Sequence, residues 1–121
     1  SATLNAVIDT GLAVSDADYA RALSGAAAIR ELALKLFGAC DLIASLPAPG
    51  AAPARLDTTG DPSYCTLWSL TGSPAITLPT GLSEGGLPYG LQLAAATGAD
   101  DRLLRAANWC ETAIGFDSTP F

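Results

Sequence analysis

The sequence predicts an α/β fold in which about three strands form a mixed sheet flanked by helices. Between Asp16 and Phe37, apolar residues recur at the spacing of a helix. The run from Cys40 to Leu46 follows directly, is mostly apolar on both faces, and is stopped by Pro47, which is typical of an interior strand in a parallel or mixed sheet. Two further apolar runs flank the Gly85-Gly86 pair, which predicts a hairpin.

The N-terminal third is predicted to be helical. Residues 1–13 mix apolar and polar residues and predict a short helix. Ser15 can then cap a second helix over 16–37, with Asp18 reaching back to it. Gly38 is expected to supply a left-handed exit. The apolar residues of this second helix cover more than one stripe, so we expect it to be buried on two sides.

A connector separates this part from the rest of the chain. Residues 47–60 contain the run P-A-P-G-A-A-P-A-R, which suits neither a strand nor a helix. Asp61 and Pro62 then predict a helix start, with the aspartate as cap and the proline in the first helical position, and Gly72 predicts its end. One face of this helix is predicted to consist of Tyr64, Leu67, Trp68 and Thr71.

The remaining residues predict a hairpin and a final helix. A strand over 75–78 ends at Pro79, and a strand over 89–95 returns antiparallel to it. Asp100 is expected to cap the last helix and Gly115 to end it. Its apolar face is predicted to consist of Leu103, Leu104, Ala107, Cys110 and Ile114.

Composition argues against several classes of partner. Twelve acidic residues face six basic ones, for a net charge of −6, and the basic residues are scattered. Because binding to phosphates needs grouped cations, we expect neither a nucleic-acid partner nor an anionic membrane surface. The longest uncharged stretch, residues 62–83, is interrupted by prolines and glycines and does not predict a membrane span.

The cysteines and the first residues predict a cytoplasmic protein. Three cysteines lie far apart and form no C-x-x-C pair, which fits reduced thiols better than a disulfide framework. Residues 1–12 lack the basic start and sustained apolar run of a signal peptide.

Missing residue types restrict the chemistry of this chain. There is no histidine, which excludes Ser-His-Asp and Cys-His sites and zinc sites built on imidazole. No phosphate-binding glycine loop occurs, and we predict no metal or cofactor. Lys35, the only lysine, lies within a helical pattern and is interpreted as a solvated cation. Asp100 and Asp101 are interpreted as a cap and its neighbour rather than an acid–base pair.

An ordered set of motifs resembles the last third of amidase-signature enzymes. The set reads G-D-P-S-Y-C-T-L-W-S-L-T-G-S-P-A-I-T-L-P-T-G-L, then G-G-L-P-Y-G-L-Q-L, then D-D-R-L-L-R-A-A-N-W-C-E, and it spans residues 60–111. The earlier D-A-D-Y-A-R-A-L and C-D-L-I-A-S-L-P-A-P-G are similar to the preceding helix and strand of that family. The resemblance implies that residues 1–121 are the C-terminal segment of an incomplete amidase-signature domain.

The resemblance also implies what the chain lacks. The family hydrolyses amides or esters through an acyl-enzyme, using a serine in a glycine- and serine-rich loop, a second serine on a cis peptide and an upstream lysine. No residue here matches those positions, so we expect no catalytic residue and no turnover by this chain alone. The resemblance implies a role as scaffold and substrate-pocket wall.

Three residues are candidates for the pocket wall. In relatives, the tryptophan-bearing helix and the following G-x-P-A turn approach the substrate, which implicates Trp68, Tyr64 and Cys65. Cys65 stands where relatives often carry asparagine, so a polar contact there is in doubt. The competing interpretation makes Trp68 and Tyr64 ordinary core aromatics.

Two kinds of partner follow from these predictions. The first is the N-terminal catalytic part of the amidase, encoded by the same gene or present as a separate chain. The alternative is a non-enzymatic interaction domain that pairs with a second copy through its bare sheet edge. The glutamine-hydrolysing component of a tRNA-linked amidotransferase belongs to the same superfamily and ranks lower, because nothing indicates a surface for the tRNA-charging partner. The sequence does not identify a substrate.

Overall fold

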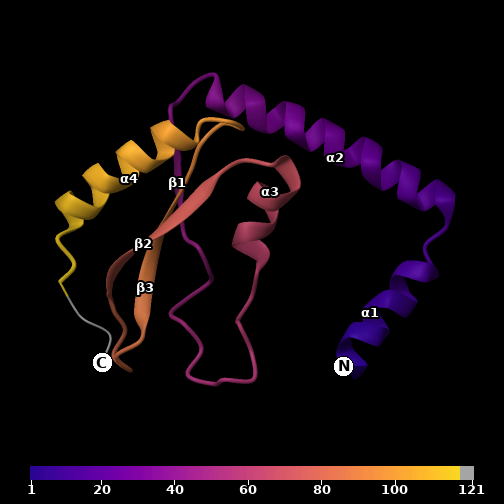
Figure 1. The fold of residues 1–121 in the computed structure, drawn as a ribbon, viewed down its shortest axis with the longest axis horizontal. Coiled ribbons are helices and arrows are strands. Elements are labelled where there is room, and N and C mark those ends of the chain that lie inside the picture. The colour runs from indigo at the N-terminus through magenta and orange to yellow at the C-terminus, as the bar shows by residue number, and fades with distance from the viewer. Residues whose placement is uncertain (118–121) are drawn as a thin grey trace.

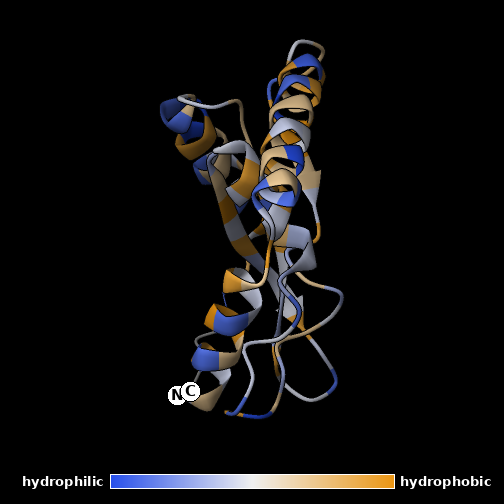
Figure 2. Ribbon diagram, turned by 90° about the vertical axis from the view of Figure 1, so that its right-hand side faces the viewer, coloured by the Kyte–Doolittle hydropathy of each residue, from blue (hydrophilic) through white to orange (hydrophobic). Residues whose placement is uncertain are grey.

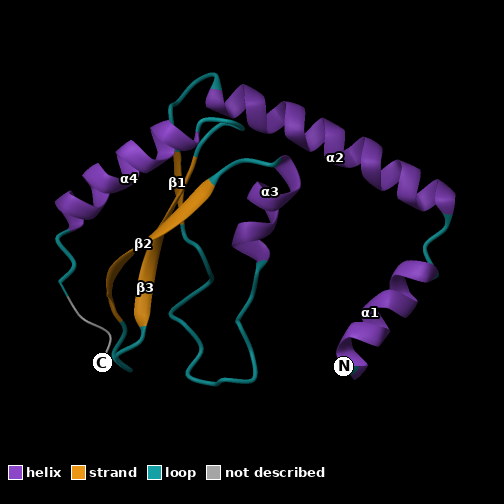
Figure 3. Ribbon diagram, in the orientation of Figure 1, coloured by secondary structure: helices purple, strands orange, loops and turns teal. Residues whose placement is uncertain are grey.

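The computed structural model describes residues 1–117 and confirms the α/β class (Figure 1, Figure 3). Within these residues the chain forms four helices and three strands. In order, they are α1 (Ala2–Leu12), α2 (Asp16–Phe37), β1 (Ile43–Ser45), α3 (Ser63–Thr71), β2 (Ala75–Leu82), β3 (Pro88–Ala94) and α4 (Asp100–Ile114). No helix or strand forms between Leu46 and Pro62, where the connector was predicted.

The three strands form one sheet in the order β1-β3-β2. Both pairings are antiparallel, so the part of the sheet seen in residues 1–117 is not mixed. The hairpin of β2 and β3 forms as predicted, but β2 does not end at Pro79. It continues to Leu82, because a register shift between Pro79 and Gly81 lets its pairing with β3 resume beyond the proline. β1 is a three-residue edge strand rather than the expected interior strand, because β3 returns between β1 and β2.

The two faces of the sheet pack against different helices (Figure 1). Side chains alternate along a strand, so Leu91 and Leu93 of β3 lie on the face that α4 covers, where they pack with Leu78, Leu103 and Ala107. The intervening Gln92 faces α3 on the other side, where Trp68 contacts it. The apolar core is therefore small and lies mainly between the sheet and α4.

Helices α1 and α2 extend away from the sheet (Figure 1) and carry both hydrophobic and hydrophilic residues (Figure 2). Most of their side chains are exposed. The predicted two-sided burial of α2 is not found in this chain, where Ala33 is its only buried residue. The reason is that α3 is the one element that α2 packs against closely among residues 1–117, with Arg30 Nε donating to the carbonyl of Leu70 at 3.0 Å. None of the helices in residues 1–117 combines the length and hydropathy that a transmembrane span needs.

The helix ends follow the predictions in part. Ser15 caps α2, and its Oγ accepts from the backbone N–H of Asp18 at 3.2 Å. Gly72 and Gly115 end their helices in the left-handed region, with φ of 70° and 60°. Gly38, in contrast, is right-handed, because its N–H still bonds to carbonyls of the last turn of α2.

Two N-terminal boundaries also differ from the predictions. Pro62 is the N-cap of α3 rather than its first residue, and Asp61 acts one position further out by accepting from the backbone N–H of Ser63 at 2.8 Å. Asp100 does not cap α4. It is the first helical residue and follows Ala99, whose side chain offers no capping oxygen.

Two adjacent leucines of α4 test how much of the stability comes from this core. Leu103 is 3% exposed and Leu104 is 58% exposed. We expect Leu103→Ala to lower the free energy of unfolding by about 2–4 kcal/mol, because it leaves a cavity beside Leu78 and Leu93. Leu104→Ala should change it by less than about 1 kcal/mol. Urea unfolding followed by circular dichroism measures both, and equal effects would contradict this position of the core.

Candidate functional site

A hollow of ≈ 320 Å³ lies where α3 meets the α3-facing side of the sheet. Helix α3 contributes Cys65, Trp68 and Ser69, and β3 contributes Gln92. The remaining lining residues follow α3 or belong to β2: Ser73, Ala75 and Thr77. The register pairs Thr77 with Gln92, so both residues reach the same side of the sheet. Two of the three residues predicted from the sequence, Trp68 and Cys65, therefore line one hollow.

Gln92 is the centre of the hydrogen bonds around this hollow. Its side-chain oxygen accepts from Trp68 Nε1 at 2.6 Å and from Ser45 Oγ at 3.1 Å. Its Nε2 donates to Cys65 Sγ at 3.4 Å, and the thiol donates to the carbonyl of Pro47 at 3.4 Å. Gln92 is 3% exposed, and burying a carboxamide is costly unless such partners are present. This set of bonds joins β1, the connector, α3 and β3.

The environment of Trp68 fits both interpretations of this residue. The indole is buried and its ring centre lies 6.3 Å from that of Phe37 at the end of α2, which is a core-like contact. The same side chain lines the hollow. Tyr64 differs, because it is exposed and is absent from the hollow's lining. Its role as a pocket residue stays a prediction.

Sequence reasoning missed Gln92. The available signal was a single amide residue in the apolar run G-L-Q-L-A-A of β3. A buried polar side chain needs hydrogen-bond partners, so a glutamine within an apolar strand indicates a hydrogen-bonded site on one face of the sheet.

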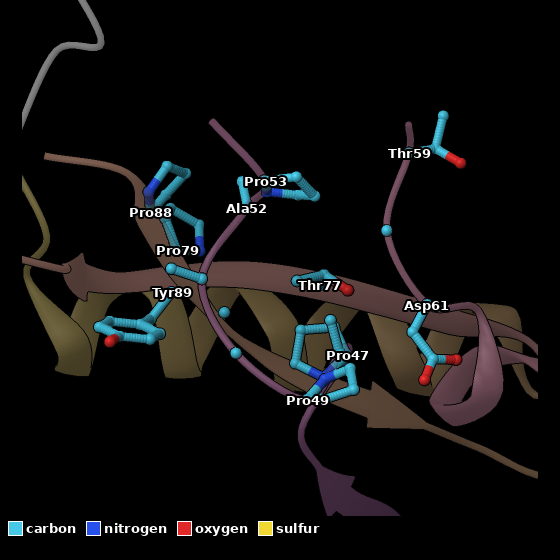
Figure 4. A pocket seen from close by; sticks show the side chains of 15 residues that line it. Pro47, Pro49, Ala52, Pro53, Thr59, Asp61, Thr77, Pro79, Pro88 and Tyr89 are labelled. Atoms are coloured by element: carbon cyan, nitrogen blue, oxygen red, sulfur yellow. The ribbon is translucent and has the colours of Figure 1, made fainter. Parts of the chain in front are cut away.

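A second hollow, of ≈ 590 Å³, lies between the connector and the hairpin (Figure 4). Its walls are mostly proline, glycine and alanine of the connector, facing Thr77 and Tyr89 of the sheet. Gly90 allows this close approach: a Cβ there would lie 2.5 Å from Thr77 Cγ2 and 2.9 Å from Pro47 Cγ. The backbone of β3 can therefore pass under the connector only without a side chain at that position.

Asp61 is the one ionisable carboxylate on the wall of this second hollow. Figure 4 shows it on the opposite side from Tyr89, with the connector prolines between them. Hydrogen bonds from the Ser63 hydroxyl and from the Ser63 backbone N–H lower the pKa of Asp61 below its ordinary value of 3.8. The carboxylate is therefore ionised at neutral pH.

The described residues offer binding groups and no reactive pair. Lys35 is exposed on α2, and among residues 1–117 its ammonium group makes no hydrogen bond or ion pair. Residues 1–117 also contain no cluster of histidine, cysteine, aspartate or glutamate placed to hold a metal ion. Within this part of the chain, the hollows can bind and orient a ligand through amide, hydroxyl and apolar contacts.

Comparisons with known proteins identify the class. No family model matches the chain. The A component of glutamyl-tRNA(Gln) amidotransferase from Neisseria meningitidis serogroup C is 42% identical over 79 residues, which are 60% of this chain and 16% of that protein. The protein of the same name from Wolinella succinogenes is 36% identical over 108 residues, which are 84% of this chain and 24% of that protein.

Solved structures agree with the sequence matches. A crystal structure described as an amidase matches 93% of this chain and 29% of its own, with a TM-score of 0.80 and 29% identity. A bacterial aryl acylamidase of the amidase-signature family matches 97% of this chain and 29% of its own, with a TM-score of 0.65; at 19% identity it supports the fold alone. The chain belongs to the amidase-signature family, and it spans about a quarter or less of the length of the curated relatives it matches.

The two tryptophans provide a test of the Gln92 hydrogen bonds. Trp68→Phe removes the Nε1 donor and part of a buried ring, so we expect it to lower the free energy of unfolding by about 1–3 kcal/mol. Trp109→Phe, at a residue that is 71% exposed, is the matched control and should change it by less than about 0.5 kcal/mol. Urea unfolding followed by circular dichroism measures both variants. Equal stability of the two would show that the bond to Gln92 contributes nothing.

Asp61 gives a pH-dependent prediction. Because its folded-state pKa is lowered, the ionised carboxylate stabilises the folded chain above the ordinary pKa of 3.8, and this contribution is lost as pH falls through the folded value. Asp61→Asn should therefore be less stable than the unmodified chain at neutral pH, and the difference should disappear in acid. Thermal unfolding across pH measures it, with Glu84→Gln in the hairpin turn as control. A difference that persists below the folded pKa would contradict the assignment.

Proposed function

We propose that this chain is the C-terminal portion of an amidase that hydrolyses the C–N bond of amides or the C–O bond of the corresponding esters. In this proposal it supplies scaffold and substrate-pocket wall, and the catalytic serines and lysine belong to the N-terminal part of the enzyme. The observation that supports this most directly is the match to the solved amidase, which covers 93% of this chain and 29% of the amidase.

The exposed apolar surface supports the same division of labour. Large apolar side chains on α1 and α2 are about half or more exposed. On α1 they recur at helical spacing: Leu4, Val7, Ile8 and Leu12. On α2 they lie on two opposite sides of the helix, Leu23 and Leu34 on one and Leu32 and Leu36 on the other. Exposed apolar side chains gathered on neighbouring elements are a mark of an interface. We assign it to the N-terminal catalytic part, from the same gene or from a separate chain, because the curated relatives described above are four or more times longer than the matched region.

The proposal also includes a cellular compartment and an alternative pairing of chains. The three cysteines are free, and Cys40 and Cys65 are exposed, which fits a reducing compartment such as the cytoplasm. Pairing with a second copy through β1 or β2, the edge strands of this sheet, is the alternative arrangement. The comparisons give no support to the interaction-domain alternative.

A second candidate function is favoured by the sequence relatives. The two curated relatives described above carry the name of the A component of glutamyl-tRNA(Gln) amidotransferase, at 42% and 36% identity. A chain of that kind would serve an enzyme that takes its amide nitrogen from glutamine. Assaying the complete protein with glutamine and with simple aliphatic and aryl amides separates the two candidates, because only the second predicts a marked preference for glutamine.

The proposal predicts how activity depends on the catalytic part. The 121-residue chain alone should hydrolyse neither amides nor esters, because none of its residues matches the family's catalytic serines and its only lysine makes no side-chain hydrogen bond or ion pair in the described residues. Adding the N-terminal part of the same amidase should restore ammonia release. Ammonia and p-nitrophenol release measure both states, with a serine-to-alanine variant of the added part as control. Turnover that persists in the chain alone after repeated purification would overturn the proposal.

A further inference from the structure

The hollow at α3 contains one buried donor that is only weakly satisfied. Gln92 is 3% exposed and lines the hollow. Its side-chain oxygen already accepts two hydrogen bonds, from Trp68 and Ser45, which fixes the orientation of the carboxamide plane. The NH₂ group is therefore held on the side of Cys65, and its described side-chain partner is the Cys65 sulfur at 3.4 Å.

A thiol is a poor acceptor for such a donor. A carboxamide NH₂ carries two N–H donors, whereas sulfur accepts hydrogen bonds only weakly. A carbonyl oxygen in the same place would make a stronger bond, and in a buried setting the difference is larger than in water. The hydroxyls of Ser69, Ser73 and Thr77 border the same hollow and can accept from or donate to the other half of a ligand.

We infer that this hollow binds the carboxamide group of a small amide, with the ligand's carbonyl oxygen accepting from Gln92 Nε2. Its volume of ≈ 320 Å³ is at the lower end of the range for small-molecule sites and leaves room for a small ligand. The indole of Trp68 and the methyl group of Ala75 offer an apolar wall for a short alkyl group beside the amide. This inference rests on the proposed function, because it names the part of an amide substrate that this chain would recognise.

The test titrates the ¹⁵N-labelled 121-residue chain with isobutyramide. The indole N–H signal of Trp68 and the side-chain NH₂ signals of Gln92 should shift and saturate, while the indole signal of Trp109, which is 71% exposed, stays in place. Isobutylamine has the same branched alkyl group without a carbonyl and should give no saturating shift. Saturation with both probes, or with neither, would overturn the inference.

Two variants identify the donor. Gln92→Leu should abolish the saturating shift, read at the backbone N–H of Thr77. Cys65→Ala keeps Gln92 and removes the competing thiol, so it should tighten binding about three- to tenfold, the range that one modest hydrogen bond represents. Unchanged affinity in Cys65→Ala would contradict the role of the Gln92 donor even if Gln92→Leu fails to fold.

The outcome can be separated from that of the proposed function. Binding is measured on this chain without catalysis, whereas the hydrolase proposal is measured as ammonia release by the complete protein. Saturating binding without hydrolysis would overturn only the hydrolase proposal. Hydrolysis without binding in the hollow would overturn only the inference.

Discussion

The attachment of α3 to the sheet depends on one buried carboxamide. Gln92 stands on the central strand, and its partners belong to β1 and α3. A buried amide without partners costs a few kcal/mol, so its bonds favour one placement of α3 and β1 over others that would leave it unsatisfied. Trp68 donates to Gln92 through its indole nitrogen, and its ring also packs near Phe37. The end of α2 is therefore connected through Trp68 to Gln92.

The two faces of the sheet serve different purposes. The α4 face is apolar and contains Leu78, Leu93, Leu103 and Ala107, so it supplies stability. The opposite face is polar at its centre and contains the hollow next to α3, so it supplies specific binding groups. A single strand, β3, contributes to both the apolar face and the polar face, because neighbouring residues of a strand point to opposite sides of the sheet.

The exposed helices α1 and α2 indicate how the chain is used. Their apolar side chains are spaced for packing, yet little of this chain covers them. A core of this size leaves a 121-residue chain with modest stability, because small domains bury a smaller share of their surface. In the proposed function, the rest of an amidase covers these helices and thereby adds stability to the fold.

The sequence by itself determined the local structure and the family. Periodicity and capping residues predicted all four helices and the hairpin, because these depend on neighbours within a few residues: Ser15 and Gly115 act where the pattern indicated. The predictions were wrong where the structure depends on residues that are far apart in the sequence. The place of β1 at a sheet edge depends on β3 returning beside it. The burial of α2 depends on which elements pack against it, and among residues 1–117 only α3 does so closely. Tertiary structure alone decided that Trp68 and Cys65 share a hollow with Gln92, because a hydrogen bond across 24 or 27 residues leaves no periodic signal.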